Sequence, residues 1–520
     1  MKGKKSFNNN PQSYWIASAP ASNYSALEED IKVHIAIVGG GIAGISCAYL
    51  LSKEGEKPVI LEADHILQGT TGHTTAKITS QHDLIYDKIK NQMSFEFAQE
   101  YAIANEFSIH LIEKISNELN IDCDLQSESA YVYTNRDEYI EKINKEAETA
   151  ESLGIKAAVI DKIPFNIPIK AALRFDNQAQ FHPRKYLLKL AEEIIKNGCG
   201  IYEQTRAVHM EKNNDCYIIT TGQGKKVTSD IVIIASHYPF YNKQGMYFTR
   251  IYTERSYVLA VKSKEKYPGG MYLSYEDPGR SLRSIKTDNG ELIMIGGESH
   301  KTGQGEDTTK HYQTLAEFAD NIFTVEDIPY RWSAQDCMPL DDLPYAGRYS
   351  PDTPNLYIAT GFKKWGMTNS TASAMILKDL ILKGESSWQD VYNPSRSTIL
   401  AQTKNFIVEN LNVAGQLIDG KLATKPDDTE IKTGEGKVIL KDGKRVGAYR
   451  DEKDNMHFVN TTCTHMGCEL NWNSAERTWD CPCHGSRFSV DGNIIEGPAV
   501  RTLKDDKDTN TIQKLFKENF

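Results

Sequence analysis

The sequence predicts an α/β dinucleotide-binding domain of the Rossmann type, interwoven with an α+β domain, and a small all-β domain toward the C-terminal end. Three observations predict this fold class. A glycine-rich turn joins a β-branched strand to a helix near residue 40, and helical and strand-like periods alternate through the middle of the chain. Short alternating strands separated by Gly and Asp turns follow residue 428.

Composition is that of an ordinary globular protein. Of the 520 residues, 40% are apolar and 25% are charged, which suffices for two or three buried cores. The formal net charge of -10 argues against a nucleic-acid partner, because such binding needs a basic surface. The longest apolar stretch, residues 35–51, is broken by glycines, so no transmembrane segment is predicted. No apolar core follows the basic N-terminal residues, so we expect a cytoplasmic protein.

Four segments are expected along the chain. Residues 1–30 are rich in Asn, Ser, Ala and Pro and should form an irregular arm, which Tyr14 and Trp15 could anchor on the body. Residues 31–385 carry the mixed α and β body, residues 386–427 a helical or irregular linker, and residues 428–520 the small β domain.

The body opens with a βαβ unit. The strand VHIAIVGG, the helix IAGISCAYLLSKEG and the strand PVILEAD follow one another from residue 33. The turn has the pattern GxGxxG, whose glycines let the backbone approach a pyrophosphate at a helix N-terminus. Glu62 ends the second strand, roughly 20 residues after the turn, where an acidic side chain can bind ribose hydroxyls. The candidate contacts of this unit are Gly39, Gly41, Ile42, Ala43, Gly44, Glu62 and Ala63.

The rest of the body mixes both periods. Helical periods cover residues 95–119, 139–153 and 184–197, and strand-like runs cover residues 230–236 and 291–297. A last strand at 355–361 precedes a helix that ends near residue 384. A second glycine-rich turn between a strand and a helix is missing, so we expect no separate NAD(P)H site.

Residues 31–385 resemble FAD-dependent oxidoreductases of the D-amino-acid oxidase and glycine oxidase superfamily. Besides the GxGxxG turn, the resemblance depends on the segment RWSAQDCMPLDDLPYAG, with matches at Trp332, Asp341, Pro344 and Gly347. It also depends on NLYIATGFKKWGM at 355–367, where the family places its isoalloxazine. The resemblance implies an FAD-binding domain of the GR2 type, an interwoven substrate domain and FAD as cofactor.

The family also implies further flavin contacts. The loop GTTGHTTAKIT at 69–79 offers hydroxyls and glycine backbone for phosphate or flavin, although an ordinary turn remains the alternative. His73 and Cys337 are residue types that relatives use for covalent attachment, but Cys337 is out of register, so noncovalent FAD is expected. The implied contacts are Thr70, Thr71, Thr74, Thr75, Val208, Gly361, Gly366 and Met367.

One position departs from the family pattern. Aligned on Trp332, amino-acid oxidases carry an Arg near position 336 that holds the substrate carboxylate, whereas this chain has Asp336. A carboxylate there would suit a cationic group such as an amine, and a purely structural role for Asp336 is the alternative. The substrate is therefore expected to be an amine or an amino-acid-like compound.

The C-terminal domain holds four of the nine cysteines in two short boxes. CTHMGC begins at Cys463 and CPCHGS at Cys481, while the other five cysteines are scattered and expected to be inert. Cys and His at such spacings can bind a structural zinc or an iron-sulfur cluster. The two boxes closely resemble the Rieske proteins of cytochrome bc complexes, which also explains the extra cysteine in each box.

The Rieske resemblance assigns each residue of the boxes. Cys463 and Cys481 would hold one iron of a [2Fe-2S] cluster, and His465 and His484 the other. The resemblance also implies a disulfide between Cys468 and Cys483. Because the cytosol is reducing, the cluster loops would have to shield this bond from reductants. Three further positions have implied roles: Ser486 as hydroxyl donor to cluster sulfur, Phe488 where high-potential members have Tyr, and Pro498 as cover of the cluster.

Together the two cofactors suggest a dehydrogenase. FAD accepts two electrons from an organic substrate, and the cluster passes single electrons to an external acceptor, an unidentified protein or a quinone. The alternatives are a redox sensor or electron-transfer module without small-molecule turnover, and an oxidase that reduces O₂. No catalytic residue is identified. Four positions are candidates, and a structural role is the favoured alternative for each: Tyr257, Tyr275, His300 and Lys364.

Overall fold

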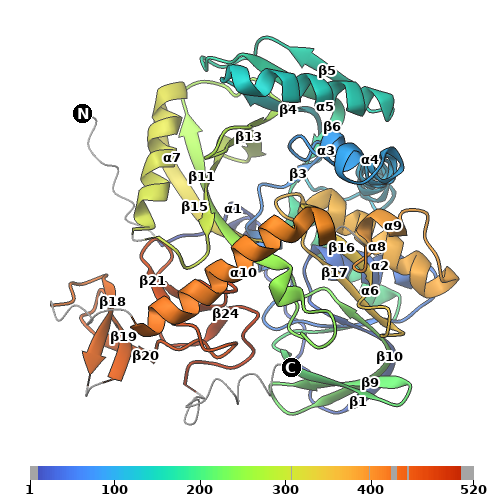
Figure 1. Cartoon of the computed structure of the whole chain (residues 1–520), viewed down its shortest axis with the longest axis vertical. Helices are drawn as coiled ribbons and strands as arrows, with labels where there is room; N and C mark the ends of the chain where they lie inside the picture. Colours follow the sequence, from blue (N-terminus) through green and yellow to red (C-terminus); the bar gives the residue numbers. More distant parts are fainter. Residues whose placement is uncertain (1–9, 306, 397–398, 423–429, 442–443, 505–520) are drawn as a thin grey trace.

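The computed structural model describes residues 10–305, 307–396, 399–422, 430–441 and 444–504 (Figure 1). Its first sheet has the strand order β16-β17-β10-β1-β2-β7, with β8 and β9 attached beside β10. The strands are β1 (Ile31–Val38), β2 (Val59–Leu61), β7 (Gly200–Tyr202), β8 (Ala207–Asn213), β9 (Cys216–Thr221), β10 (Lys226–Ile234), β16 (Tyr345–Arg348) and β17 (Leu356–Thr360).

The centre of this sheet is parallel. β1 pairs in parallel with β10 on one side and β2 on the other, and the last four residues of β1 are buried. A parallel strand covered on both faces is a continuous apolar run, which is why IAIV appears without alternation. The carboxyl end of β1 therefore delivers the glycine-rich turn to the edge where ligands bind in this architecture.

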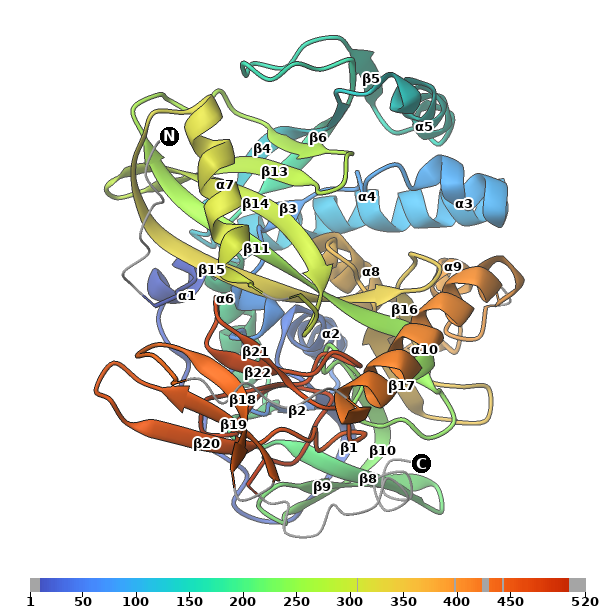
Figure 2. The same ribbon diagram turned by 60° about the vertical axis from the view of Figure 1, so that its left-hand side comes forward.

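A second, mostly antiparallel sheet stands over that edge (Figure 2). Its strand order is β15-β11-β14-β13-β12-β4-β6-β3, and β5 pairs with β6. The strands are β3 (Lys77–Ile78), β4 (Gln126–Thr134), β5 (Ala157–Ile160), β6 (Ala171–Gln180), β11 (Ile251–Ser263), β12 (Met271–Ser274), β13 (Arg280–Thr287), β14 (Gly290–Lys301) and β15 (Val325–Pro339). The chain crosses between the two sheets several times, so the predicted interweaving of the two parts is confirmed.

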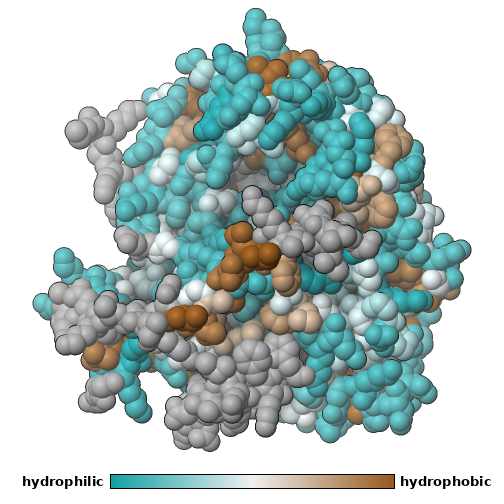
Figure 3. Space-filling model, viewed as in Figure 1, coloured by the Kyte–Doolittle hydropathy of each residue, from teal (hydrophilic) through white to brown (hydrophobic). Residues whose placement is uncertain are grey.

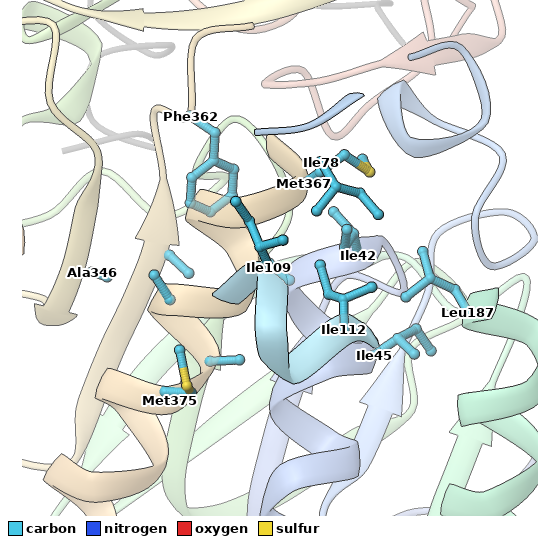
Figure 4. Packing of buried hydrophobic residues seen from close by; sticks show 14 of the residues in the cluster. Ile42, Ile45, Ile78, Ile109, Ile112, Leu187, Ala346, Phe362, Met367 and Met375 are labelled. Atoms are coloured by element: carbon cyan, nitrogen blue, oxygen red, sulfur yellow. The ribbon is translucent and has the colours of Figure 1, made fainter. Parts of the chain in front are cut away.

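Helices α2 (Ile42–Lys53), α4 (Phe95–Glu118) and α8 (Gly366–Lys383) pack together beside the parallel sheet. Figure 4 shows Ile42 and Ile45 of α2 close to Ile112 of α4, with Met367 at the start of α8 above them. These side chains belong to one buried apolar cluster. Burial of such side chains contributes roughly 2 kcal/mol each, so α2 is held firmly beneath the glycine-rich turn.

The other helices surround the two sheets. The predicted helical periods correspond to α4, α5 and α6. The N-terminal arm, predicted to be irregular, contains the short helix α1 at residues 14–17. Trp15 of α1 is fully buried, because its neighbours close over it. The helices not yet given are α1 (Tyr14–Ala17), α3 (Tyr86–Gln92), α5 (Ile140–Ser152), α6 (Pro183–Lys196), α7 (Thr309–Ile322), α9 (Gln389–Tyr392) and α10 (Ile399–Leu422), with 3-10 turns η1 (Thr70–Gly72), η2 (Asp137–Tyr139) and η3 (Tyr247–Thr249).

The C-terminal domain consists of two small antiparallel sheets, as predicted. One is β18-β19-β20 and the other β21-β22-β23-β24. Their core contains the cysteines of both boxes together with Trp479 and Phe488. The strands are β18 (Gly436–Lys441), β19 (Lys444–Arg450), β20 (Met456–Asn460), β21 (Asn471–Asn473), β22 (Thr478–Asp480), β23 (Arg487–Phe488) and β24 (Ile494–Glu496).

Helix α10 crosses the surface between the body and the C-terminal domain (Figure 1). Several of its large apolar side chains are exposed, and they form a brown strip in Figure 3. These are Phe406, Ile407, Val408, Leu411 and Ile418. Among the residues that the structure describes, no helix combines the length and the apolar character needed to span a bilayer.

Candidate functional site

The glycine-rich turn lies at the mouth of a cavity of about 1000 Å³ between the two sheets. Gly39 has φ +112°, and a Cβ there would lie 2.4 Å from the Ala235 carbonyl oxygen. Gly39, Gly41, Ile42 and Ala43 line the cavity. Gly44 does not line it, and a Cβ on Gly44 would lie 1.9 Å from the Gly39 carbonyl oxygen. Gly44 is therefore needed for close packing of α2 against the turn.

Glu62 lies at the same end of the cavity, and Ala63 lines it as well. Glu62 Oε2 accepts a hydrogen bond from the Gly40 N–H at 2.7 Å, and Oε1 accepts one from the Asp64 N–H at 2.9 Å. Burial raises the pKa of the Glu62 carboxyl, whereas these two N–H groups oppose the rise. The carboxylate is thus fixed beside the turn, where a ribose is expected.

The predicted threonine loop forms another wall. Thr70, Thr71, Thr74 and Thr75 all line the cavity. Thr71 Oγ1 accepts a hydrogen bond from the Ile42 N–H at 3.0 Å, so the loop is tied to the start of α2.

Two buried tryptophans fix the same loop from outside. Trp332 Nε1 donates to the His73 carbonyl and Trp15 Nε1 donates to the Thr74 carbonyl, both at 2.7 Å. Trp15 of the N-terminal arm and Trp332 thus both hold the loop in place beside the cavity.

Only some predicted contacts of the segment 355–367 lie at the cavity. Gly366 and Met367 line the cavity, but Gly361 does not. Gly361 has φ +73° and its missing Cβ would lie 2.6 Å from Pro339, so this glycine permits the chain to turn. The residues of the D-x-x-P-x-x-G element are structural too, because Asp341 forms a two-point ion pair with Arg396 at 2.6 and 2.7 Å.

The structure places Val208 away from the large cavity. Ala207 and Arg206 line the large cavity instead, and Val208 lines a smaller cavity of about 210 Å³ beside His465. Successive side chains of a strand point to opposite faces, so residues 207 and 208 of β8 cannot share one wall. Ala207 thus faces the large cavity and Val208 the smaller one, and an FAD contact of Val208 stays a prediction.

Acidic and basic side chains meet at the end of the cavity roofed by β11 and β15. Asp336 lines the cavity next to Glu254, its partner in the strand register, and Lys364 Nζ lies 3.3 Å from Glu254 Oε2. Burial raises the pKa of Asp336 to about 7, against the opposing effect of Lys364. This end of the cavity can therefore bind a cation once Asp336 ionises.

Other positions selected from sequence lie around the same cavity. Tyr257, Tyr275 and Lys364 line it, and His300 accepts or donates a hydrogen bond with Tyr257 Oη at 3.0 Å. His73 also lines the cavity, whereas Cys337 is buried in a neighbouring apolar core. Cys337 is thus not part of the cavity wall, and noncovalent FAD stays a prediction.

The two Cys and His boxes come together in the C-terminal domain. Cys463 and Cys481 are free, buried and close enough for their thiols to interact. The rings of His465 and His484 lie nearly perpendicular, with centroids 5.0 Å apart. Within the described part of the chain, the buried Nδ1 of His484 has no hydrogen-bond partner. A buried ring nitrogen left in this way suits a metal ligand.

The remaining cysteines of the boxes form a disulfide. Cys468 and Cys483 are bonded, and both are nearly inaccessible to solvent. Cys481 Sγ lies within 4.8 Å of both bonded sulfurs, but sulfurs already joined to each other are poor ligands. The bridge closes a loop around the two boxes and is shielded, as its survival in a reducing environment would require.

Comparison with known proteins decides the family. Residues 34–380 match the family described as FAD dependent oxidoreductase, and residues 424–507 match the Rieske [2Fe-2S] domain. The chain is an FAD-dependent oxidoreductase with a C-terminal Rieske domain. The predicted family is thereby confirmed, and so are FAD and a [2Fe-2S] cluster as its cofactors.

Two relatives and a solved structure illustrate the breadth of the family. The chain is 44% identical over 496 residues to the Rieske 2Fe-2S iron-sulfur protein YhfW of Bacillus subtilis (strain 168), covering 95% of this chain and 97% of that one. It is 24% identical to gamma-glutamylputrescine oxidoreductase of Escherichia coli (strain K12), covering 73% and 91%. Glycine oxidase from Geobacillus kaustophilus shares the fold, with a TM-score of 0.60 at 16% identity, covering 70% and 99%.

The Rieske domain of this flavoprotein is docked against the large cavity beside the glycine-rich turn. Residues 494–500 belong to the cavity wall. Glu496 Oε2 accepts from Arg255 at 2.7 Å and lies 3.2 Å from Arg487 Nη1, so an acidic side chain joins one arginine from each part. Gln335 Nε2 donates to the Gly485 carbonyl at 2.9 Å, directly after His484.

Sequence reasoning missed the residues at this junction. Tyr238, Glu254 and Glu496 all line the cavity, yet none belongs to a recognisable motif. Lys77 was missed as well, although it lines the cavity and burial lowers its pKa to about 7. The available signal was weak: Tyr238 follows the predicted strand at 230–236, at the sheet edge where ligands bind.

Proposed function

We propose that this protein is a dehydrogenase that oxidises a small amine or amino-acid-like substrate at FAD. Its electrons leave one at a time through the Rieske cluster to an external acceptor, a protein or a quinone. The observation that carries the proposal is the shared wall: residues 494–500 of the Rieske domain line the same cavity as the glycine-rich turn. The four proposed cluster ligands do not line this cavity themselves, but the domain that carries them closes one of its walls, which supports electron transfer between flavin and cluster.

The FAD contacts are assigned within this proposal. The turn at the start of α2 would hold the pyrophosphate at the positive end of a helix, and Glu62 the ribose. The loop tied down by Trp15 and Trp332 would hold phosphate or flavin. The assigned residues are Gly39, Gly41, Ile42, Ala43, Glu62, Ala63, Thr70, Thr71, Thr74, Thr75, Ala207, Gly366 and Met367.

The cluster ligands are assigned in the same way. Cys463 and Cys481 would hold one iron as thiolates, and His465 and His484 the other as imidazoles. Burial lowers the pKa of His484 to about 4, so its ring is neutral at physiological pH and can act as a ligand. Zinc would need neither the disulfide nor the second domain, so an iron-sulfur cluster explains the site better.

The cavity residues give the proposal its substrate class. FAD supplies the capacity to accept two electrons from a C–N or C–H bond. Lys364 is paired with Glu254, so Asp336 is the carboxylate that we assign to the substrate cation. The relative acting on gamma-glutamylputrescine, by its name, supports an amine, and the Asp in place of a carboxylate-binding Arg points the same way.

The test is anaerobic mixing of the FAD and cluster-loaded protein with a panel of amines and amino acids. We expect flavin absorbance to bleach with at least one amine, and the EPR signal of the reduced cluster to appear afterwards. A Cys463→Ser variant should still bleach but should lose transfer to one-electron acceptors. Cys216→Ser, which alters a free cysteine outside the Rieske domain, is the matched control.

Other outcomes would identify the rival functions. Peroxide formation that is unaffected by Cys463→Ser would show an oxidase and overturn the dehydrogenase. Reduction of flavin and cluster only by protein partners, with none of the small molecules, would show an electron-transfer module or sensor.

A further inference from the structure

Tyr238 lies between the flavin cavity and the Rieske boxes. It follows β10, lines the large cavity, and is only 3% exposed. Its ring meets the ring of His484 edge to face, with centroids 6.5 Å apart. Burial raises the pKa of Tyr238 well above its ordinary value, and the nearby thiols of Cys337 and Cys481 add to the rise. A residue of the flavoprotein body thus reaches two of the proposed cluster ligands.

The hydroxyl of Tyr238 is unsatisfied as the protein stands. Within the described residues, Tyr238 Oη is buried and has no hydrogen-bond partner. A buried hydroxyl without a hydrogen-bond partner lowers the stability of the folded state by about 1–3 kcal/mol, so buried hydroxyls are usually bonded to an acceptor. Sulfur atoms of a cluster held by Cys481 and Cys463 would be acceptors at this place.

One hydroxyl of the Rieske domain already contacts a proposed cluster ligand. The Ser486 hydroxyl interacts with the Cys463 thiol and accepts from the Ala499 N–H at 3.0 Å. Phe488, which is fully buried in the same core, carries no hydroxyl. Tyr238, which lies near His484 and Cys481, is in position to be a second hydroxyl donor from outside the domain.

We propose that Tyr238 of the flavoprotein body donates a hydrogen bond to a sulfur of the Rieske cluster. The body then tunes the cluster only while the two parts are docked. Hydrogen bonds to cluster sulfur stabilise the reduced form, so this bond raises the midpoint potential of the cluster. Gln335, through its bond to Gly485, is what keeps the donor and the cluster loop together. The inference rests on the proposed cluster ligands.

The experiment compares Tyr238→Phe with the unaltered protein, both loaded with FAD and cluster. We expect the cluster midpoint to fall while the flavin midpoint stays constant. Fe–S vibrations measured by resonance Raman should lose part of their shift in D₂O, because one exchangeable donor is gone. Tyr241→Phe, which removes a hydroxyl three residues away in the same segment, is the matched control and should change neither quantity.

A second substitution guards against a folding defect. Incorporation of 3-fluorotyrosine at position 238 makes the hydroxyl a stronger donor and should shift the cluster midpoint upward, the opposite of Tyr238→Phe. An unchanged cluster midpoint and D₂O shift in both substituted proteins would overturn the inference, as would a change confined to the flavin. If the unaltered protein lacked a Rieske EPR signal, the proposed ligands themselves would be wrong, which is a separate failure.

Discussion

Glu254 on β11 and Asp336 on β15 are directly opposed residues of two antiparallel strands, and both line the flavin cavity. Lys364 approaches Glu254 at 3.3 Å and so compensates one of the two charges. Lys363, the neighbouring ammonium group on the cavity wall, is paired with Asp342 at 2.7 Å, so Asp336 is the carboxylate that we assign to a substrate cation. This relationship supports the amine substrate that we propose.

Substitution of Asp336 by Asn should weaken the handling of an amine substrate. Removing one charge from a buried pair costs about 2–5 kcal/mol, so kcat/KM should fall roughly 30-fold or more. Asp327→Asn, an exposed carboxylate on the same strand, is the control. Steady-state kinetics on an identified amine with unchanged turnover in Asp336→Asn would remove Asp336 from the substrate site.

The reaction should depend on pH through Asp336, whose pKa is raised to about 7. Flavin reduction by a cationic amine should increase as the pH rises through about 7, because only the ionised carboxylate attracts the cation. The same raised pKa makes the folded state favour the protonated acid, so stability contributed by this group falls as the pH rises from its ordinary value of 3.8 to about 7. Asp336→Asn should flatten both profiles, as measured by stopped-flow reduction and thermal unfolding at several pH values.

Gly44→Ala should abolish tight FAD binding. The added Cβ would lie 1.9 Å from the Gly39 carbonyl oxygen, so α2 must move away from the turn that it supports. Overpacking of this kind costs about 1–3 kcal/mol of stability as well. Flavin absorbance retained after gel filtration measures the effect, and full retention would contradict it. Gly415→Ala, in open surroundings on α10, should leave FAD in place.

Glu496→Gln should loosen the docking of the Rieske domain. Burial opposes ionisation of Glu496, but Arg487 and Arg255 outweigh it and hold its pKa at about 2. Breaking such a buried network costs about 3 kcal/mol. Stability from this group is complete above its ordinary pKa of 4.5 and is lost as the pH falls toward 2. The unfolding temperature should drop and flavin-to-cluster transfer should slow.

The control for that change is a surface pair of the same domain. Glu452 lies 2.6 Å from Arg477 with its side chain 57% exposed, so Glu452→Gln should cost less than about 1 kcal/mol. Equal effects of Glu496→Gln and Glu452→Gln would show that Glu496 does not hold the domains together.

Phe488→Tyr should raise the midpoint potential of the cluster. The new hydroxyl would add a hydrogen bond to cluster sulfur, and the natural protein should therefore lie below the upper end of the roughly -150 to +300 mV Rieske range. Voltammetry of the loaded protein measures the change. Phe458→Tyr, at a surface position of β20, should leave the potential unaltered. The absence of any rise in Phe488→Tyr would refute the role given to position 488.

Local pattern was enough to predict much of the fold. The strand before Gly39 follows from a continuous apolar run, and the helices α4, α5 and α6 follow from a period of 3.6 residues. Both patterns depend only on neighbours in sequence. The FAD contact of Val208 stays a prediction, because the face of β8 on which a residue lies depends on the register of that strand, which no motif fixes. The composition of the arm around Trp15 predicts irregular chain, whereas the structure has a short helix there. The difference arises because contacts with distant segments bury Trp15, and such contacts leave no local signal.

By itself the sequence determined the two cofactors of this protein, since a GxGxxG turn and paired Cys and His boxes are short-range patterns set by the chemistry of phosphate and iron. Only the tertiary structure decided that the Rieske domain supplies part of the wall of the cavity beside the glycine-rich turn. Glu496 meets Arg255 across 241 positions of the chain, and Tyr238 meets His484 across a comparable span. Such contacts arise from the docking of whole domains, and no local signal in the sequence encodes them.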